Sequence, residues 1–294
     1  MTVPARPARP TPLFADIADV SRRLAETGYL ADTATATAVF LADRLAKPLL
    51  VEGPAGVGKT ELARAVAQAT GSGLVRLQCY EGVDEARALY EWNHAKQILR
   101  IQAGSGDWEA TKTDVFSEEF LLQRPLLTAI RRTEPTVLLI DETDKADIEI
   151  EGMLLEVLSD FAVTVPELGT LTAERAPFVL LTSNATRELS EALKRRCLFL
   201  YIDFPSPELE RRILLSRVPE LPEHLAEELV RVIGVLRGMQ LKKLPSIAET
   251  IDWGRTVLAL GLDTIDDALV AATLGVVLKH QSDQQRAAGE LRLN

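Results

Sequence analysis

The sequence feature that most constrains this chain is the loop Gly-Pro-Ala-Gly-Val-Gly-Lys-Thr at residues 53–60. It matches the pattern G-x-x-x-x-G-K-S/T at every fixed position. Glycines let backbone N–H groups turn toward an anion, and a helix that begins at the loop directs its positive dipole end to the same point. An apolar segment at 48–52 precedes the loop, and helical periodicity follows at 61–70. The sequence therefore predicts a binding site for nucleotide phosphates.

Every residue of this loop is a candidate nucleotide ligand. The candidates are Gly53, Pro54, Ala55, Gly56, Val57, Gly58, Lys59 and Thr60. We expect Lys59 to reach the β- and γ-phosphates and the Thr60 hydroxyl to ligate Mg²⁺. ATP and Mg²⁺ are therefore the expected cofactors.

Two carboxylates, Asp141 and Glu142, follow the apolar segment at 136–140. Such a segment is typical of a strand buried on both faces of a parallel sheet, and ligands of open α/β sheets lie at the carboxyl ends of the strands. We expect Asp141 to hold Mg²⁺, mostly through water, and Glu142 to orient and polarise an attacking water. The nearby Asp144 and Asp147 are interpreted as a solvated loop residue and a helix-start residue.

Strands and helices alternate through residues 15–204. Strands are predicted at 48–52, 74–78, 136–140, 178–182 and 198–202, with a hairpin around Pro166 and Gly169. Helices are predicted at 16–27, 31–46, 61–70, 84–100, 118–132 and 147–158. This order predicts an α/β fold, an αβα sandwich around a parallel sheet with right-handed crossovers.

The character of the sequence changes after Phe204, where only helical patterns remain. Ser206 is a predicted cap for a helix whose first turn holds Pro207 and Glu208. We predict an extended, partly disordered tail at 1–14, an α/β domain at 15–204 and a smaller all-helical domain at 205–294. The tail has no apolar segment of the kind found in secretory signals.

Composition narrows the function classes. The net charge is −10, which argues against a nucleic-acid partner because phosphate binding needs concentrated Lys and Arg. Cys79 and Cys197 form no CxxC pair, so we expect no structural metal site and a reducing, cytoplasmic environment. No apolar run approaches the roughly 18 residues of a membrane span.

The order of these motifs resembles that of AAA+ ATPases over about residues 15–290. In addition to the phosphate loop and the acidic pair, the segment Phe178-Val-Leu-Leu-Thr-Ser-Asn184 is similar to the sensor-1 strand of that family. The resemblance implies that Asn184 hydrogen-bonds the attacking water or the γ-phosphate. It also implies that the helical domain corresponds to the lid domain of AAA+ proteins.

A finer resemblance is to the MoxR branch of AAA+ proteins. It rests on the segment from Asn184 to Arg196 and on the hairpin at 166–170. It implies that Arg196 is an arginine finger, with Arg195 as the alternate because the family often has Asp at that place. A finger acts on the γ-phosphate of a neighbouring subunit, which implies a ring, expected to be a hexamer.

The segment Lys242-Lys-Leu-Pro-Ser-Ile-Ala-Glu-Thr-Ile-Asp-Trp253 resembles CoxD-type members of this branch. These are associated with the maturation of molybdenum-containing carbon monoxide dehydrogenases and related enzymes. The resemblance implies a client protein, a metalloenzyme awaiting its cofactor. It also implies a von Willebrand factor A domain protein as adaptor.

The family usually has a sensor-2 arginine early in the helix that starts at Ser246, but position 248 is Ala. Ser246 and Glu249 instead have the spacing of a capping box. Arg255 lies about two turns further along the same face. A substitute sensor and a surface salt bridge both remain open for Arg255.

Residues 90–93 and 103–113, the latter with Trp108, are interpreted either as a substrate-facing insertion or as an ordinary amphipathic helix and loop. Either interpretation is compatible with an ATP-driven chaperone or assembly factor, the function that we predict. The alternatives are a nucleic-acid remodelling motor and a small-molecule kinase or GTPase. The motor requires a dense basic stripe, and the notable paired arginines late in the chain are Arg195, Arg196, Arg211 and Arg212. The GTPase requires Asn-Lys-x-Asp, and Asp144-Lys-Ala-Asp147 differs at its first residue.

Overall fold

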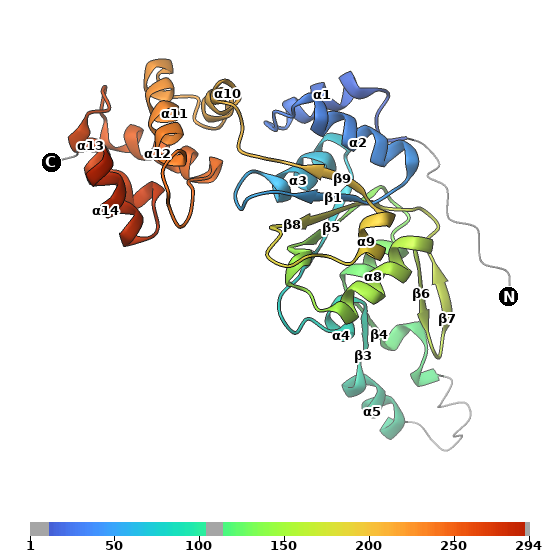
Figure 1. Cartoon of the computed structure of the whole chain (residues 1–294). Coiled ribbons are helices and arrows are strands. Elements are labelled where there is room, and N and C mark those ends of the chain that lie inside the picture. Colours follow the sequence, from blue (N-terminus) through green and yellow to red (C-terminus); the bar gives the residue numbers. More distant parts are fainter. Residues whose placement is uncertain (1–11, 104–113, 292–294) are drawn as a thin grey trace. The chain divides into compact units, whose positions relative to one another are not determined.

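The computed structural model of the chain describes residues 12–103 and 114–291 (Figure 1). The chain divides into two compact units. The first, which we call the α/β unit, comprises Met1–Thr27, Ala31–Glu52 and Thr60–Tyr201. The second, the helical unit, comprises Gly28–Leu30, Gly53–Lys59 and Ile202–Asn294. Most of the phosphate loop thus groups with the helical unit, although it connects two elements of the α/β unit.

The α/β unit is built on a five-stranded sheet with the order β2-β5-β8-β1-β9. All its neighbouring strands are parallel. The strands are β1 (Leu49–Glu52), β2 (Gly73–Gln78), β5 (Thr136–Asp141), β8 (Phe178–Ser183) and β9 (Leu198–Tyr201). Every residue of β5 and β8 is buried, which confirms the prediction of strands covered on both faces. β2 lies at an edge, and its residues alternate in exposure.

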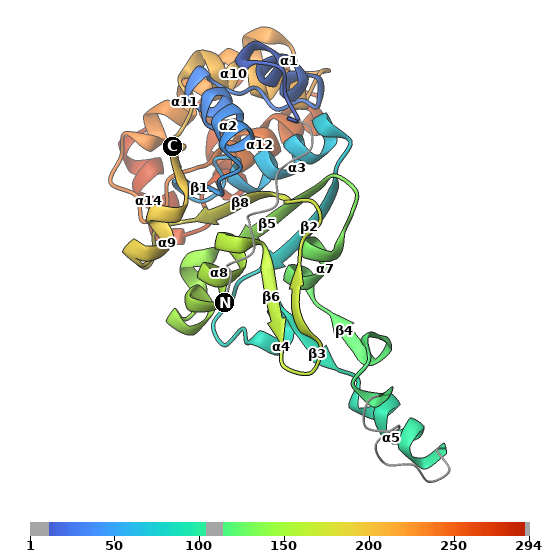
Figure 2. The same ribbon diagram turned by 90° about the vertical axis from the view of Figure 1, so that its right-hand side faces the viewer.

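Helices cover both faces of this sheet, so the predicted αβα sandwich is confirmed. The helices are α1 (Ile17–Glu26), α2 (Thr33–Leu45), α3 (Lys59–Thr70), α7 (Pro125–Arg131), α8 (Ile148–Asp160) and α9 (Glu191–Arg196). α2 and α3 lie on one face, and α7 and α8 lie on the other (Figure 2). The side chains of Asp16 and Asp32 cap α1 and α2 by accepting hydrogen bonds from backbone N–H groups of their first turns.

Two predicted helices are wrong in part. The segment 84–100 divides into α4 (Glu85–Ala88), β3 (Tyr90–Trp92) and α5 (His94–Ala103). The segment 118–132 begins with a 3-10 turn, η1 (Glu118–Phe120), and with β4 (Leu121–Gln123) before α7. β3 and β4 pair antiparallel, with Trp92 opposite Leu121. Each of these strands therefore interrupts a segment that the sequence predicted as one continuous helix.

Local chemistry supports this division. Pro125 occupies the first turn of α7, where a missing backbone N–H is harmless. The Asn93 side chain accepts from the Lys96 N–H and so starts α5. Trp92 packs edge-on against Phe116, with ring centroids 5.4 Å apart. The predicted polar insertion with Trp108 lies largely outside the described residues.

The predicted hairpin around Pro166 and Gly169 is confirmed. It consists of β6 (Ala162–Val165) and β7 (Gly169–Thr172), which pair antiparallel. Gly169 has φ of +80°, a left-handed conformation that favours glycine at the turn. The hairpin forms a separate two-stranded sheet beside the main one.

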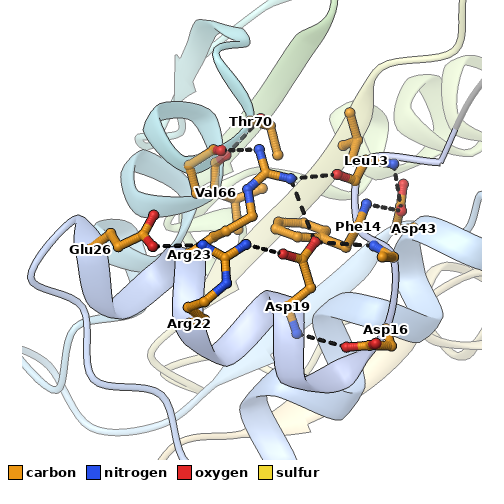
Figure 3. Close-up of polar contacts among 12 residues, drawn as sticks. Leu13, Phe14, Asp16, Asp19, Arg22, Arg23, Glu26, Asp43, Val66 and Thr70 are labelled. Carbon is orange, nitrogen blue, oxygen red and sulfur yellow. Dashed lines mark hydrogen bonds and ion pairs between the residues drawn. The ribbon is translucent and has the colours of Figure 1, made fainter.

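The end of the predicted tail is fixed in place (Figure 3). The Asp43 carboxylate accepts hydrogen bonds from the backbone N–H groups of Leu13 and Phe14 at 2.8 and 3.2 Å. Arg23 donates to the Leu13 carbonyl and lies 5.2 Å from the Phe14 ring centroid. Phe14 is buried, so the end of the predicted tail packs against the α/β unit. Residues 1–11 lie outside the described part.

The helical unit contains α10 (Pro207–Arg217), α11 (Glu223–Arg237), α12 (Ile247–Leu260), α13 (Asp267–Val277) and α14 (Gln281–Glu290). Ser206 caps α10 as predicted, and Ser246 with Glu249 forms the predicted capping box of α12. Trp253 is buried in the core, and its indole N–H donates to the Thr273 hydroxyl at 2.8 Å. Among the described residues, no helix is both long and apolar enough to cross a bilayer.

The core of the helical unit also buries a charged pair. Glu210 has only 2% of its side chain exposed, and Arg237 binds it through both guanidinium NH groups at 2.6 and 2.8 Å. Thr250 donates a third hydrogen bond to the same carboxylate. Because all these partners are needed to balance a buried charge, the pair ties α10, α11 and α12 together.

Candidate nucleotide site

The phosphate loop joins β1 to α3 and has a backbone that favours glycine. Gly53 has φ of +153°, and a Cβ there would lie 1.9 Å from the Ile202 carbonyl oxygen. Gly58 has φ of +100°. The Lys59 ammonium group donates to the carbonyls of Gly53 and Pro54, each at 2.7 Å. The loop therefore curls around the cation that the sequence assigns to phosphate binding.

Thr60 follows Lys59 directly and lies in the first turn of α3. Its hydroxyl donates to Asp141 Oδ1 at 2.9 Å, and the Thr182 hydroxyl donates to the same oxygen at 2.6 Å. The structure thus brings together the two residues predicted to ligate Mg²⁺. Hydroxyl and carboxylate oxygens are the donors that Mg²⁺ prefers, and one or two protein ligands completed by water and phosphate are usual for it.

No cluster of three or more His, Cys, Asp or Glu suited to hold a metal ion occurs in the described part of the chain. Burial raises the pKa of both the Cys79 and the Cys197 thiol to about 12. Both are therefore protonated, unreactive thiols at neutral pH.

Glu142 is held at the carboxyl end of β5 in an unusual backbone conformation. Its φ of +56° is left-handed, which is strained for a residue with a side chain. Its N–H donates to the Thr182 hydroxyl at 2.8 Å, which fixes the turn. Its carboxylate Oε2 accepts from Gln78 Nε2 at 2.8 Å and from Lys145 Nζ at 2.7 Å. The side chain is one-third exposed, at 33%, so it is both positioned and accessible.

Two residues of β2 that the sequence analysis missed complete this cluster. Gln78 lies opposite Asp141 in the register of β2 and β5, and Arg76 lies two residues earlier on the same face. Arg76 Nε donates to Asp141 Oδ2 at 3.0 Å, and its NH2 group binds the same oxygen. The available signal was the alternation of β2, which places two polar residues on one face of a strand.

Asp144 corrects one interpretation made from the sequence. It lies in the turn η2 (Thr143–Lys145), and only 3% of it is exposed, so it is not a solvated loop residue. Its carboxylate accepts from the N–H groups of Asn184 and Thr186 and from the Thr186 hydroxyl. Burial raises the pKa of this carboxyl, but the hydrogen bonds from Thr186 and Asn184 outweigh it and lower the pKa overall. Asp147, in contrast, is the N-cap residue of α8, a helix start as predicted.

Asn184 follows β8 directly, as its predicted role requires. Its backbone is fixed by Asp144, and the next residue, Ala185, has a left-handed φ of +55°. Asp144 and Asn184 thus form one loop at the same end of the sheet as Asp141, because β5 and β8 are adjacent and parallel. The sequence analysis missed Asp144 as the residue that positions this loop.

Arg195 and Arg196 are both exposed at the end of α9. Arg196 donates to the Ser159 hydroxyl of α8 and, at 3.4 Å, to the Ala192 carbonyl. No hydrogen bond or ion pair is recorded for Arg195 within residues 12–103 and 114–291. Within the described residues, neither arginine is therefore hydrogen-bonded to the cluster of Thr60, Asp141 and Glu142.

Arg255 of α12 forms an ion pair with Asp252 at 3.4 Å, and both side chains are about 60% exposed. Of the two interpretations left open for Arg255, the surface salt bridge is therefore the one present in the structure. Ala248 is exposed in the first turn of α12 and offers no cation.

A parallel sheet with this loop after its internal strand β1 and an acidic pair after β5 defines a P-loop nucleotide-binding domain of the AAA+ class. Residues 48–197, just over half of the chain, match the family model described as AAA domain (dynein-related subfamily). The chain belongs to this family, whose members are ATPases.

The curated relatives include chaperone proteins. The chain is 24% identical over 219 residues to the chaperone protein ClpB of Chlamydia pneumoniae, covering 70% of this chain and 23% of the relative. It is 33% identical over 143 residues to ClpB 2 of Thermosynechococcus vestitus, covering 47% of this chain and 14% of the relative. The chain thus spans a quarter or less of the length of these two proteins.

Among solved structures, a RuvB mutant from Thermotoga maritima matches 83% of this chain and 67% of its own. The TM-score is 0.50 at 17% sequence identity. A likeness at this identity supports the fold, which is the AAA+ arrangement of a parallel sheet followed by helices, and does not extend to the activity of RuvB.

Proposed function

We propose that this protein is an ATP-hydrolysing AAA+ chaperone or assembly factor of MoxR type that remodels a partner protein. The observation that carries the proposal is the cluster at the carboxyl ends of the strands. Thr60 and Asp141 are joined at 2.9 Å, and Glu142 projects beside them with its carboxylate held by Gln78. This arrangement is expected for a site in which Thr60 and Asp141 bind the metal ion of a nucleotide triphosphate and Glu142 activates the water that attacks it.

In the proposed mechanism, Lys59 and the backbone of residues 53–60 bind the β- and γ-phosphates. Thr60 and Asp141 would hold Mg²⁺, which when bound neutralises charge on the phosphate oxygens. Glu142 accepts the proton of the attacking water, and its hydrogen bond from Gln78 fixes the direction of the carboxylate. Asn184 orients that water or the γ-phosphate from the next strand.

The site is completed by an arginine from a neighbouring subunit, in a ring that we propose to be a hexamer. Arg196 is the proposed finger, and Arg195 remains the alternate. Both are exposed on α9, as an arginine that acts on another subunit must be. Residues 205–294 would be the lid domain of the family, and residues 15–204 its α/β ATPase domain.

A protein client is favoured over nucleic acid. The chain carries a net charge of −10, and the matched ClpB proteins are named chaperones. The resemblance of residues 242–253 to CoxD-type proteins supports a metalloenzyme client of the molybdenum hydroxylase and carbon monoxide dehydrogenase type. It also supports a von Willebrand factor A domain protein as adaptor, in the cytoplasm.

The test is capture of a partner by a variant that binds ATP without hydrolysing it. Glu142→Gln protein is used as bait with ATP in its native cell extract, and Lys59→Ala, which lacks the phosphate-binding cation, is the matched control. We expect a protein, and in particular a metalloenzyme lacking its cofactor, to co-purify with the first bait and not with the second. Recovery of nucleic acid without protein would refute the proposal and favour a nucleic-acid motor.

A further inference from the structure

The carboxylate of Asp141 is fully used by donors from its own chain. Oδ1 accepts hydrogen bonds from the hydroxyls of Thr60 and Thr182. Oδ2 accepts from both Nε and NH2 of Arg76, at 3.0 and 2.5 Å. A carboxylate has about four acceptor positions, so Arg76 takes the half that faces away from the two threonines. It is also the partner that brings a positive charge.

The two sides of this ion pair differ in their surroundings. The Asp141 side chain is 3% exposed, whereas the Arg76 side chain is 44% exposed. Arg76 is on the edge strand β2, so no further strand of the sheet covers it on its outer side. The carboxylate is therefore fixed, whereas the guanidinium can move out to solvent, where water hydrates it.

A hydrogen bond to Gln78 holds the guanidinium of Arg76 in position beside Asp141. Its NH2 group also donates to Gln78 Oε1, and Gln78 in turn donates to Glu142 at 2.8 Å. Since Arg76 and Gln78 are two residues apart on one strand, their side chains share a face and this geometry is built into β2. The cation is thus placed against the one carboxylate that the proposed function assigns to the divalent ion.

We propose that Arg76 is an internal counterion of Asp141 that competes with Mg²⁺ for that carboxylate. Arg76 thereby sets the Mg²⁺ concentration that half-saturates nucleotide binding. The proposal rests on the proposed function, in which Asp141 holds Mg²⁺. A divalent ion and a guanidinium at the same carboxylate repel each other, so Mg²⁺ binds only when Arg76 moves away. Arg76 is a positioning residue for the metal site and takes no part in the chemical step.

The experiment measures binding of the fluorescent analogue mant-ATP to full-length protein as free Mg²⁺ is varied, in the Glu142→Gln background that prevents turnover. Arg76→Ala is expected to lower the half-saturating Mg²⁺ concentration about tenfold, the effect of one unit charge near a divalent ion under water-like screening. Arg76→Lys keeps the charge but loses the bidentate contact with Asp141, so we expect it to lower the half-saturating Mg²⁺ concentration about threefold. Arg124→Ala is the matched control, because Arg124 is 40% exposed and ion-paired with Glu91.

The possible outcomes separate this proposal from others. An unchanged half-saturating Mg²⁺ concentration in both Arg76 variants, or a higher one, would overturn it, since a merely structural Arg76 supports the metal site rather than competing for it. Weaker mant-ATP binding in EDTA with no Mg²⁺ shift would instead make Arg76 a phosphate ligand. If Arg76→Ala does not fold, the Arg76→Lys result decides. Absence of mant-ATP binding by the unsubstituted protein in saturating Mg²⁺ would refute the proposed function, and this proposal with it.

Discussion

The hydroxyl group of Thr182 connects the carboxylate of Asp141 to the backbone N–H of Glu142. It donates to Asp141 Oδ1 at 2.6 Å, and it accepts from the N–H of Glu142 at 2.8 Å. Only 1% of the residue is exposed, so water cannot replace either bond. Thr182→Val keeps the shape of the side chain and removes both bonds.

The expected loss of folding stability in Thr182→Val follows from these two hydrogen bonds. A hydrogen bond to a charged carboxylate contributes about 1.5–3 kcal/mol, and a buried N–H without a partner costs about 1–3 kcal/mol. The two terms share one side chain and overlap, so we expect Thr182→Val to lower the free energy of unfolding by about 2–4 kcal/mol. Thr182→Ser retains the hydroxyl and should lose clearly less.

The assay is urea-induced unfolding followed by far-ultraviolet circular dichroism, with the free energy obtained by linear extrapolation. A parallel shift of the midpoint without a change of slope assigns the effect to the native state. If Thr182→Val unfolded within about 0.5 kcal/mol of the unsubstituted protein, as an ordinary surface substitution does, the hydroxyl would not hold the acidic pair and this reasoning would be refuted.

Three further predictions follow from other contacts. Arg237→Met leaves the buried Glu210 carboxylate without its charged partner and should destabilise the helical unit by about 3–5 kcal/mol in thermal unfolding, whereas an unchanged melting temperature would contradict this. Burial raises the pKa of Glu151, but hydrogen bonds from Ser190 and Arg187 lower it overall from 4.5, so its stabilisation is complete above pH 4.5 and is lost as the pH falls through the lowered value. Glu151→Gln should therefore flatten the loss of stability on acidification below pH 4.5, and parallel stability curves would refute the assignment. Arg196→Ala should abolish ATP hydrolysis and regain part of it when mixed with Lys59→Ala subunits, and no recovery in the mixture would argue against a finger acting between subunits.

Those parts of the fold that depend on local chemistry could be predicted from the sequence. The largely apolar segments at 136–140 and 178–182 are strands buried on both faces, because neither of them carries a polar face to turn toward water. The caps Ser206 and Ser246 were also predictable, since a capping side chain acts within three residues of its own position.

Features that depend on distant pairing could not be predicted in this way. Residues 84–100 have helical periodicity, but Tyr90–Trp92 gains its hydrogen bonds from β4, a strand about thirty residues further along the chain. The side chain of Asp144 looked solvated because its neighbours are polar, and its burial comes from the loop at Asn184–Thr186. A single sequence does not specify which distant loop covers a turn.

The same reason explains why Arg76 and Gln78 were missed in the sequence. Thr60, Asp141 and Glu142 belong to recognisable motifs, and the structure brings the first two into contact. Arg76 and Gln78 are recognisable only once β2 is known to lie beside β5 with Gln78 opposite Asp141. The order of strands in a parallel sheet is not the order of the chain, so the neighbours of a catalytic strand have to be read from the structure.

The central claim is that Glu142 activates water at a nucleotide bound by the phosphate loop. The measurement that tests it most directly compares ATP binding and phosphate release by the unsubstituted protein and by Glu142→Gln. The account predicts that both bind ATP in Mg²⁺ and that phosphate release by Glu142→Gln is at least about a hundredfold slower, the usual contribution of a general base. Equal rates of phosphate release, with binding intact in both proteins, would contradict it.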